Sequence, residues 1–182
     1  MNKKLVTFDV DGCLADFEAE FCDMFGFDNR EMVNLEKRYP KYAKEIQNFV
    51  DNPHTYTDLA PIKLGLDICT WLNDNGFEIA IVSSRPHGTQ NITIDWLEKH
   101  SVKFVSISVT PLIPKVYRVG NLSPLLHVDD MWGVARDLDK NYIDCILIDQ
   151  PWNYHKLIEF PRVKTVDGFV HALKVVYDWR TR

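Results

Sequence analysis

Residues 5–16 read LVTFDVDGCLAD, an apolar run followed directly by aspartates. Its first four residues are typical of a short buried strand. Asp9 and Asp11 come just past the end of that strand, and Gly12 permits the tight turn by which the chain leaves the sheet. In an open parallel sheet, ligands bind outside the carboxyl ends of the strands. The stretch therefore predicts two carboxylates at a binding edge, and an ordinary Asp-Gly turn with solvated acids is the alternative.

Four more short β-rich runs recur along the chain, separated mostly by amphipathic stretches. The runs are Ile79 to Val82, Phe104 to Val109, Leu125 to Val128 and Cys145 to Ile148. Such alternation favours an α/β fold with a Rossmann-like doubly wound parallel sheet, and the right-handed crossover rule places helices on both faces. Apolar spacing predicts helices around residues 66–72, 92–97 and 169–177.

The interval after the first run is unusually long. About 70 residues separate this run from the second, far more than a single crossover helix needs. Within that interval, apolar residues at helical spacing indicate two or three short helices. We therefore predict a core domain, residues 1–16 and 57–182, with a small helical cap, residues 17–56, inserted after the first strand.

Composition and charge narrow the class of protein. A length of 182 residues fits one domain with a modest insertion, and 46% hydrophobic against 26% charged residues excludes an unfolded chain. The net charge of −5 has the wrong sign for a protein that binds nucleic-acid phosphates or anionic membranes. Four cysteines without a CxxC pair, and no apolar run of membrane-spanning length, favour a cytoplasmic protein with reduced thiols and no membrane partner.

Polar residues also follow two of the other predicted strands. Ser83-Ser84-Arg85 comes after the second run, and Asp129-Asp130 comes after the fourth. Because all carboxyl ends of a parallel sheet lie on one edge, these residues are expected to meet Asp9 and Asp11 there. Four carboxylates in one crevice repel unless a cation lies among them. Oxygen ligands of this kind suit Mg²⁺, which adds waters and substrate phosphate oxygens to its coordination.

The ordered motifs resemble those of a known superfamily. DxDGxLxD, a strand-end serine and Asp-Asp are similar to the haloacid dehalogenase superfamily of phosphohydrolases. Two further stretches, YTDLAPI at residues 56–62 and IDQPWN at residues 148–153, resemble the 5′(3′)-deoxyribonucleotidase branch. The similar segments cover most of the chain apart from the cap and residues 110–124. The resemblance implies a Mg²⁺-dependent phosphomonoesterase that hydrolyses deoxynucleoside monophosphates.

The resemblance also implies a role for each motif residue. Asp9 is the expected nucleophile, which forms an aspartyl-phosphate that water then hydrolyses. Asp11 is the expected acid and base, with its backbone carbonyl on the metal. Mg²⁺ is expected on Asp9, Asp11 and one of Asp129 or Asp130. Phosphate oxygens are expected on Ser83 and Ser84.

The positive groups match the family less closely. Lys115 is the best match to the family lysine, although its spacing to the Asp-Asp pair is long; Arg118, Lys103 or a solvated loop lysine are the alternatives. Arg85 departs from the nucleotidase pattern, and Ser83-Ser84-Arg85 resembles the Ser-Gly-Arg of polynucleotide 3′-phosphatases. Arg85 and Lys115 are both expected to bind the substrate phosphate.

The predicted cap is rich in aromatic residues and acidic. Residues 17–56 hold eight aromatics, 20% against 12% for the whole chain. Phe17 and Tyr56 are candidates to stack on a nucleobase, and a core of the cap itself is the alternative use of these rings. Eight acids against five bases in the same segment favour a mononucleotide over a nucleic-acid end.

Two other functions stay open at this level. One is a polynucleotide 3′-phosphatase, and the other is a non-catalytic nucleotide-binding protein on the same scaffold. The presence of both Asp9 and Asp11 favours an enzyme, since a binding module does not need both. The sequence leaves a homodimer open. For His127, two positions before Asp129, a hydrogen-bonded core histidine is the expectation.

Overall fold

A six-stranded parallel sheet forms the centre of the computed structural model, which describes residues 4–26, 40–154 and 160–180. The strand order is β3-β2-β1-β4-β5-β6. The strands are β1 (Leu5–Phe8), β2 (Glu78–Ser83), β3 (Ser106–Val109), β4 (Leu126–Asp129), β5 (Cys145–Ile148) and β6 (Arg162–Val163). This arrangement confirms the predicted doubly wound α/β fold. The last strand, with two residues, is absent from the sequence prediction.

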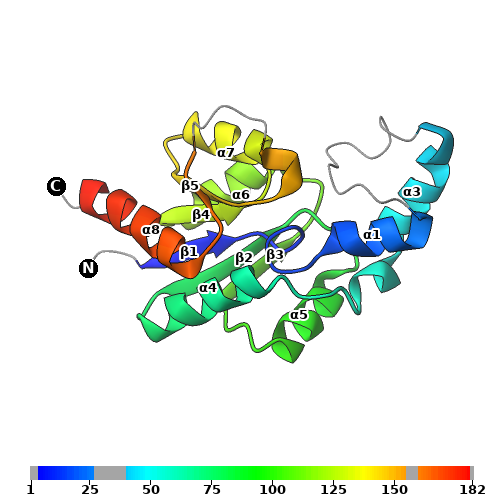
Figure 1. The fold of residues 1–182 in the computed structure, drawn as a ribbon, viewed down its shortest axis with the longest axis horizontal. Helices are drawn as coiled ribbons and strands as arrows, with labels where there is room; N and C mark the ends of the chain where they lie inside the picture. Colours follow the sequence, from blue (N-terminus) through cyan, green and yellow to red (C-terminus); the bar gives the residue numbers. More distant parts are fainter. Residues whose placement is uncertain (1–3, 27–39, 155–159, 181–182) are drawn as a thin grey trace.

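Helices cover both faces of the sheet (Figure 1). On one face lie α4 (Lys63–Asp74), α5 (Gln90–Lys99) and α8 (Val166–Arg180), which bury residues such as Ile68, Trp96 and Phe169. On the other face lie α6 (Lys115–Leu122) and α7 (Trp132–Asp139). The sequence prediction contains neither α6 nor α7. Both have only eight residues, which is shorter than the window over which a helical period of apolar residues can be recognised.

The strand order creates a crevice beside β1. From this central strand the chain first builds outward through β2 and β3, and then returns to add β4 on the other side. Phe8 lies in register with Ile81 on one side and with Val128 on the other. Ligands of doubly wound sheets bind outside the carboxyl ends of the strands at such a reversal point. Asp9 directly follows β1, Asp129 is the last residue of β4 and Asp130 follows it, so the fold brings all three to the same edge.

The segment between β1 and α4 forms short helices beyond the strand ends, on the right of Figure 1. They are α1 (Phe17–Phe25), η1 (Pro40–Tyr42), α3 (Ala43–Asp51) and η2 (Pro53–Tyr56). The Asp16 carboxylate caps α1 by accepting a hydrogen bond from the amide of Ala19 at 3.0 Å. Phe21, Ile46 and Phe49 form a small core separate from those of the sheet. The domain division at residues 16 and 57 stays a prediction, and residues 27–39 of the cap lie outside the described residues.

All four cysteines are buried and none forms a disulfide. In the described parts of the chain, no helix combines the length and the hydrophobicity needed to cross a membrane.

Candidate active site

A cavity of about 630 Å³ lies between the strand ends and the short helices. We call its two sides the core wall and the cap wall. The polar residues of the core wall are Asp9, Asp11, Ser83, Ser84, Arg85, Lys115 and Asp130. The cap wall consists of Phe17, Glu18, Gln47, Val50, Asp51 and Tyr56. Every predicted site residue thus lines the cavity except Asp129, which is fully buried and contacts Lys115 of the core wall.

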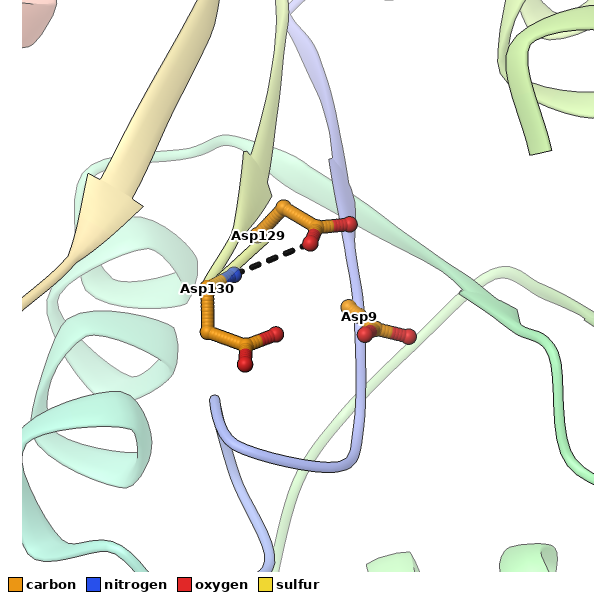
Figure 2. Close-up of side chains that lie close together, drawn as sticks. All are labelled: Asp9, Asp129 and Asp130. Atoms are coloured by element: carbon orange, nitrogen blue, oxygen red, sulfur yellow. Dashed lines mark hydrogen bonds between the residues drawn. The ribbon is translucent and has the colours of Figure 1, made fainter. Parts of the chain in front are cut away.

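Three carboxylates meet at the centre of the site. Figure 2 shows Asp129 and Asp130 at the end of β4, opposite Asp9 at the end of β1. One oxygen from each lies within 4.8 Å of the others, and all three residues are buried. Three negative charges this close in a buried place are unfavourable unless cations lie among them.

Lys115 supplies one such positive charge. It is the first residue of α6, and its Nζ lies 2.8 Å from Asp9 Oδ2 and 2.7 Å from Asp129 Oδ2. Burial alone would lower the pKa of this ammonium, but the two carboxylates outweigh burial and raise it. Arg118, one of the alternatives to Lys115, donates instead to the carbonyl of Ser83 at 2.7 Å and to Ser84 Oγ at 3.0 Å. Arg118 therefore braces the loop that carries the serines.

The three carboxylates differ in their protonation. Burial raises the pKa of Asp9 to about 7, because it outweighs the attraction of Lys115. Burial and the charges of Asp129 and Asp9 raise the pKa of Asp130 well above its usual range. Burial acts on Asp129 in the same direction, but Lys115 and His127 outweigh it and hold the pKa of Asp129 below its usual range. Asp129 is therefore the ionised partner of Lys115, and Asp9 and Asp130 are short of positive charge.

Asp130 is held by neutral groups. Its Oδ2 accepts a hydrogen bond from Trp152 Nε1 at 2.7 Å, and no ion pair joins it to a basic side chain of the described residues. Gly12 lies against it with a φ of +75°, and a Cβ at Gly12 would come within 2.4 Å of Asp130 Oδ2. Asn153 Nδ2 donates to the Asp130 carbonyl at 2.8 Å. The IDQPWN stretch thus positions this carboxylate, a role that the sequence pattern does not reveal.

His127 supports Asp129 from behind. Its Nε2 lies 3.0 Å from Asp129 Oδ2, and its Nδ1 lies 2.9 Å from Thr7 Oγ1. A carboxylate only accepts hydrogen bonds, so Nε2 is the donor. Burial lowers the pKa of His127. His127 is a buried, hydrogen-bonded histidine as expected, and Thr7, which fixes its ring, was missed because nothing in a strand residue's spacing signals such a contact.

Asp11 is paired with Arg85. The guanidinium donates from Nη2 to Asp11 Oδ1 at 2.7 Å and from Nε to Asp11 Oδ2 at 2.9 Å. Its Nη1 donates to Thr93 Oγ1 at 3.1 Å, and the Arg85 side chain is fully buried. The guanidinium carbon also lies 4.7 Å from the centre of the Tyr56 ring. Arg85 therefore contacts Asp11, the residue predicted to act as both acid and base. The sequence interpretation did not anticipate this contact.

The two predicted stacking residues differ in exposure. Tyr56 is 2% exposed, its hydroxyl donates to the carbonyl of Val50 at 2.8 Å, and its ring stacks on Phe17 at a centroid distance of 5.6 Å. Stacking needs an open ring face, and Tyr56 presents none in this structure. Phe17 is partly buried and lines the cavity. The Phe17 ring packs on Tyr56 and, at a centroid distance of 5.3 Å, on Phe49, and its base-stacking role stays a prediction.

Glu18 is a cap-wall residue that the sequence interpretation missed. Burial, reinforced by the charges of Asp11 and Asp16, raises its pKa to about 8. Its Oε2 is buried and has no hydrogen-bond partner. The only sequence signal is an acidic residue in the first turn of a helix, which is common on surfaces.

Comparison with solved structures identifies the class of protein that shares this fold, and these neighbours are described as haloacid dehalogenase-like hydrolases and phosphatases. A "predicted phosphatase" from Clostridium acetobutylicum matches 96% of this chain and 98% of its own with a TM-score of 0.65 and 18% identity. CbbY from Rhodobacter sphaeroides in complex with phosphate matches 94% and 99%, with a TM-score of 0.61 and 13% identity. YfnB from Bacillus subtilis bound to magnesium matches 96% and 100%, with a TM-score of 0.60 and 13% identity. No protein-family model and no curated protein matches the chain.

Proposed function

We propose that this protein is a Mg²⁺-dependent phosphomonoesterase that hydrolyses nucleoside monophosphates, deoxynucleotides foremost, through an aspartyl-phosphate on Asp9. The observation that carries the proposal is the buried Asp9 carboxylate at the cavity wall, with Lys115 on one side and Asp130 on the other. Solved structures with this fold include CbbY in complex with phosphate and YfnB bound to magnesium, which supports phosphate chemistry at such a site.

The carboxylates suit a divalent cation. Asp9 and Asp130 both have raised pKa values because burial and mutual repulsion are not balanced by Lys115 alone, and a cation between them would remove this imbalance. Mg²⁺ would be held by Asp9, Asp130 and the backbone carbonyl of Asp11. Asp129 is less suited, because Lys115 and His127 already bind its Oδ2. When bound, the ion would neutralise charge on the transferring phosphoryl group.

The chemistry then follows from the side chains. An Asp9 oxygen attacks phosphorus, and the bond from phosphorus to the leaving oxygen breaks as Asp11 delivers a proton to that oxygen. Asp11 next takes a proton from water, whose oxygen attacks the aspartyl-phosphate and releases phosphate and the Asp9 carboxylate. Lys115 and the Ser83 and Ser84 hydroxyls stabilise the phosphoryl oxygens.

Arg85 must adjust before Asp11 can act. Asp11 in the bidentate pair is an acceptor only, and a proton on it would displace the guanidinium. A phosphate entering between Ser84 and Lys115 offers Arg85 a second set of anionic oxygens. Transfer of Arg85 from Asp11 to the phosphate would free Asp11 for proton transfer when substrate is present.

Phosphate release tests the proposal. Purified protein is assayed on deoxynucleoside monophosphates, sugar phosphates and p-nitrophenyl phosphate, with Mg²⁺ and with excess EDTA. We expect Mg²⁺-dependent turnover, with the highest kcat/KM on a deoxynucleoside monophosphate. Full activity in excess EDTA would contradict the metal requirement. A higher kcat/KM on sugar phosphates would contradict the assignment of a nucleotide substrate.

A polynucleotide 3′-phosphatase is the second candidate, because Arg85 follows two serines at the core wall. Its guanidinium would have to hold a neighbouring phosphodiester, whereas here it is paired with Asp11. Rates on a 3′-phosphorylated oligonucleotide at low and moderate salt decide between the two. A preference for the oligonucleotide that weakens as salt rises favours the second candidate.

A further inference from the structure

The two walls of the cavity differ in charge. Both basic side chains among the described lining residues, Arg85 and Lys115, belong to the core wall. The cap wall carries the exposed carboxylate of Asp51, the buried carboxyl group of Glu18 and an amide, next to the apolar surface of Phe17 and Val50. The cap-wall polar groups are Glu18, Gln47 and Asp51. A phosphomonoester with its phosphate on the core wall therefore points its leaving group at acidic and hydrogen-bond-accepting side chains.

Both basic residues are already paired with carboxylates of the core wall. Arg85 is bidentate to Asp11, and Lys115 bridges Asp9 and Asp129. One incoming phosphate can compete for these groups because it lies beside both. A second phosphate on the same substrate, reaching toward the cap wall, would meet no further lysine, arginine or histidine among the described cavity residues.

The α3 helix presents this acidic surface directly. Gln47, Val50 and Asp51 lie at spacings of three and four, so they share one face of the helix, and all three line the cavity. Gln47 Nε2 donates to Asp51 Oδ2 at 2.8 Å, which fixes the carboxylate on this face and leaves its other oxygen available as an acceptor. Hydroxyl and amino groups of a leaving group are suitable donors, and a second phosphate is repelled.

We propose that Asp51 is a specificity-determining residue that selects substrates with one phosphate and a leaving group bearing hydrogen-bond donors. The inference rests on the proposed function. Selection for one phosphate would distinguish this site from a site that binds sugar bisphosphates. A CbbY variant from Rhodobacter sphaeroides, with the same fold at 12% identity, is described in complex with xylulose-1,5-bisphosphate. Here the acidic cap wall opposes a second phosphate at the far end of a substrate.

The test compares two matched substrates. Thymidine 5′-monophosphate and thymidine 3′,5′-bisphosphate differ only in the second phosphate, and loss of the 5′-phosphate is followed by chromatography. We expect the wild-type kcat/KM to favour the monophosphate about tenfold or more, from repulsion at short range. Asp51→Asn keeps the shape and removes the charge, so this preference falls at least about threefold. Glu45→Gln on the same helix removes an exposed charge that does not line the cavity, and its preference equals that of the wild type.

Ionic strength provides a second readout. Screening reduces repulsion between charges near water, so the wild-type preference shrinks from 20 to 300 mM salt, while that of Asp51→Asn changes less. The role of Asp51 is overturned if the wild type has equal kcat/KM on the two substrates, or if Asp51→Asn keeps the wild-type preference. In either case, hydrolysis of the monophosphate leaves the proposed function in place. No phosphate release from either substrate or from p-nitrophenyl phosphate overturns both.

Discussion

The core wall and the cap wall solve different physical problems. On the core wall, Lys115 and Arg85 are fully committed to carboxylates, and the groups are buried at the edge of a rigid sheet. On the cap wall, Asp51 and Gln47 are exposed, and Glu18 has a buried oxygen without a partner. The difference teaches that the charged groups of the core wall already have partners, which a bound phosphate would have to replace, whereas the cap wall still has hydrogen bonds to make.

The largest expected effect concerns the centre of the core wall. Asp9→Asn removes the nucleophile and keeps the side-chain shape, so we expect kcat to fall by at least about 10³-fold. The near-ultraviolet circular dichroism spectrum should match that of the wild type. Steady-state phosphate release checks the loss, and Asp67→Asn, at an exposed ion pair on α4, is the control that should keep wild-type turnover. Wild-type turnover in Asp9→Asn would exclude covalent catalysis at this residue.

The core wall is also where sequence predicted most. A parallel sheet gathers the ends of its strands at one edge, and the predicted acids lie at or within three residues of such an end: Asp9, Asp11, Asp129 and Asp130. Lys115 was found as a family match, and the alternative of a solvated loop lysine is wrong, because Lys115 is buried and begins α6. The sequence could not show that Arg85 pairs with Asp11, because this contact joins two loops through side-chain conformation.

The cap wall was predicted less well for a physical reason. Aromatic residues have the same helical spacing in a core and in a binding surface, so the sequence pattern does not distinguish the two. Only the burial of each ring does. Phe21 is fully buried and does not line the cavity, whereas Phe17 and Tyr56 both line it and Tyr56 is nearly as buried as Phe21. Gln47 and Asp51 gave no signal, because polar residues on a short helix normally face solvent.

The next prediction separates proton transfer from structure on the core wall. Asp11→Asn cannot protonate the leaving oxygen, so we expect kcat/KM on a deoxynucleoside monophosphate to fall about 10²-fold or more. The phenolate of p-nitrophenyl phosphate leaves without a proton, and the loss on this substrate should stay within about tenfold. Parallel rate measurements on the two substrates provide the check. Equal losses would assign Asp11 a structural or metal-holding role.

A third prediction concerns the unbalanced charge of the core wall. The folded-state pKa of Asp9 is raised from 3.8 to about 7, so its contribution to stability is fully present below pH 3.8 and is lost as pH rises toward 7. The raised pKa values of Asp130 and Glu18 act in the same direction. The lowered pKa of Asp129 acts only below pH 3.8, and the lowered pKa of His127 opposes the trend below about pH 6.5 as one group against three. Between pH 4 and 8 we therefore expect the metal-free protein to lose stability as pH rises.

Mg²⁺ should reverse this trend, because it binds the ionised carboxylates and competes with their protons. Below about pH 7 each pH unit weakens binding about tenfold per displaced proton, or about 1.4 kcal/mol, so the Mg²⁺-induced rise in Tm should be roughly 3–5 °C smaller at pH 6 than at pH 8. Thermal unfolding with and without Mg²⁺ measures this difference. In Asp9→Asn the pH dependence should flatten, and a Mg²⁺ effect that is independent of pH in the wild type would contradict the assignment of the ion to these carboxylates.

The smallest expected effect tests whether the cap wall recognises a base. Phe17 and Phe21 lie on successive turns of α1, yet Phe17 lines the cavity and Phe21 packs against Phe25 and Phe49 with ring centroids 4.7 and 5.5 Å apart. Phe17→Leu removes a stacking surface, so KM for a deoxynucleoside monophosphate should rise about fivefold, equivalent to about 1 kcal/mol, while kcat/KM on a sugar phosphate changes less.

Phe21→Leu is the control. It should lower the free energy of unfolding by about 1–2 kcal/mol with little change in KM, since the loss is in packing. Thermal unfolding and steady-state kinetics on both variants separate the two uses of an aromatic ring. If both variants shift Tm and neither shifts KM, the rings are the core of the cap alone, and base recognition lies elsewhere in the molecule.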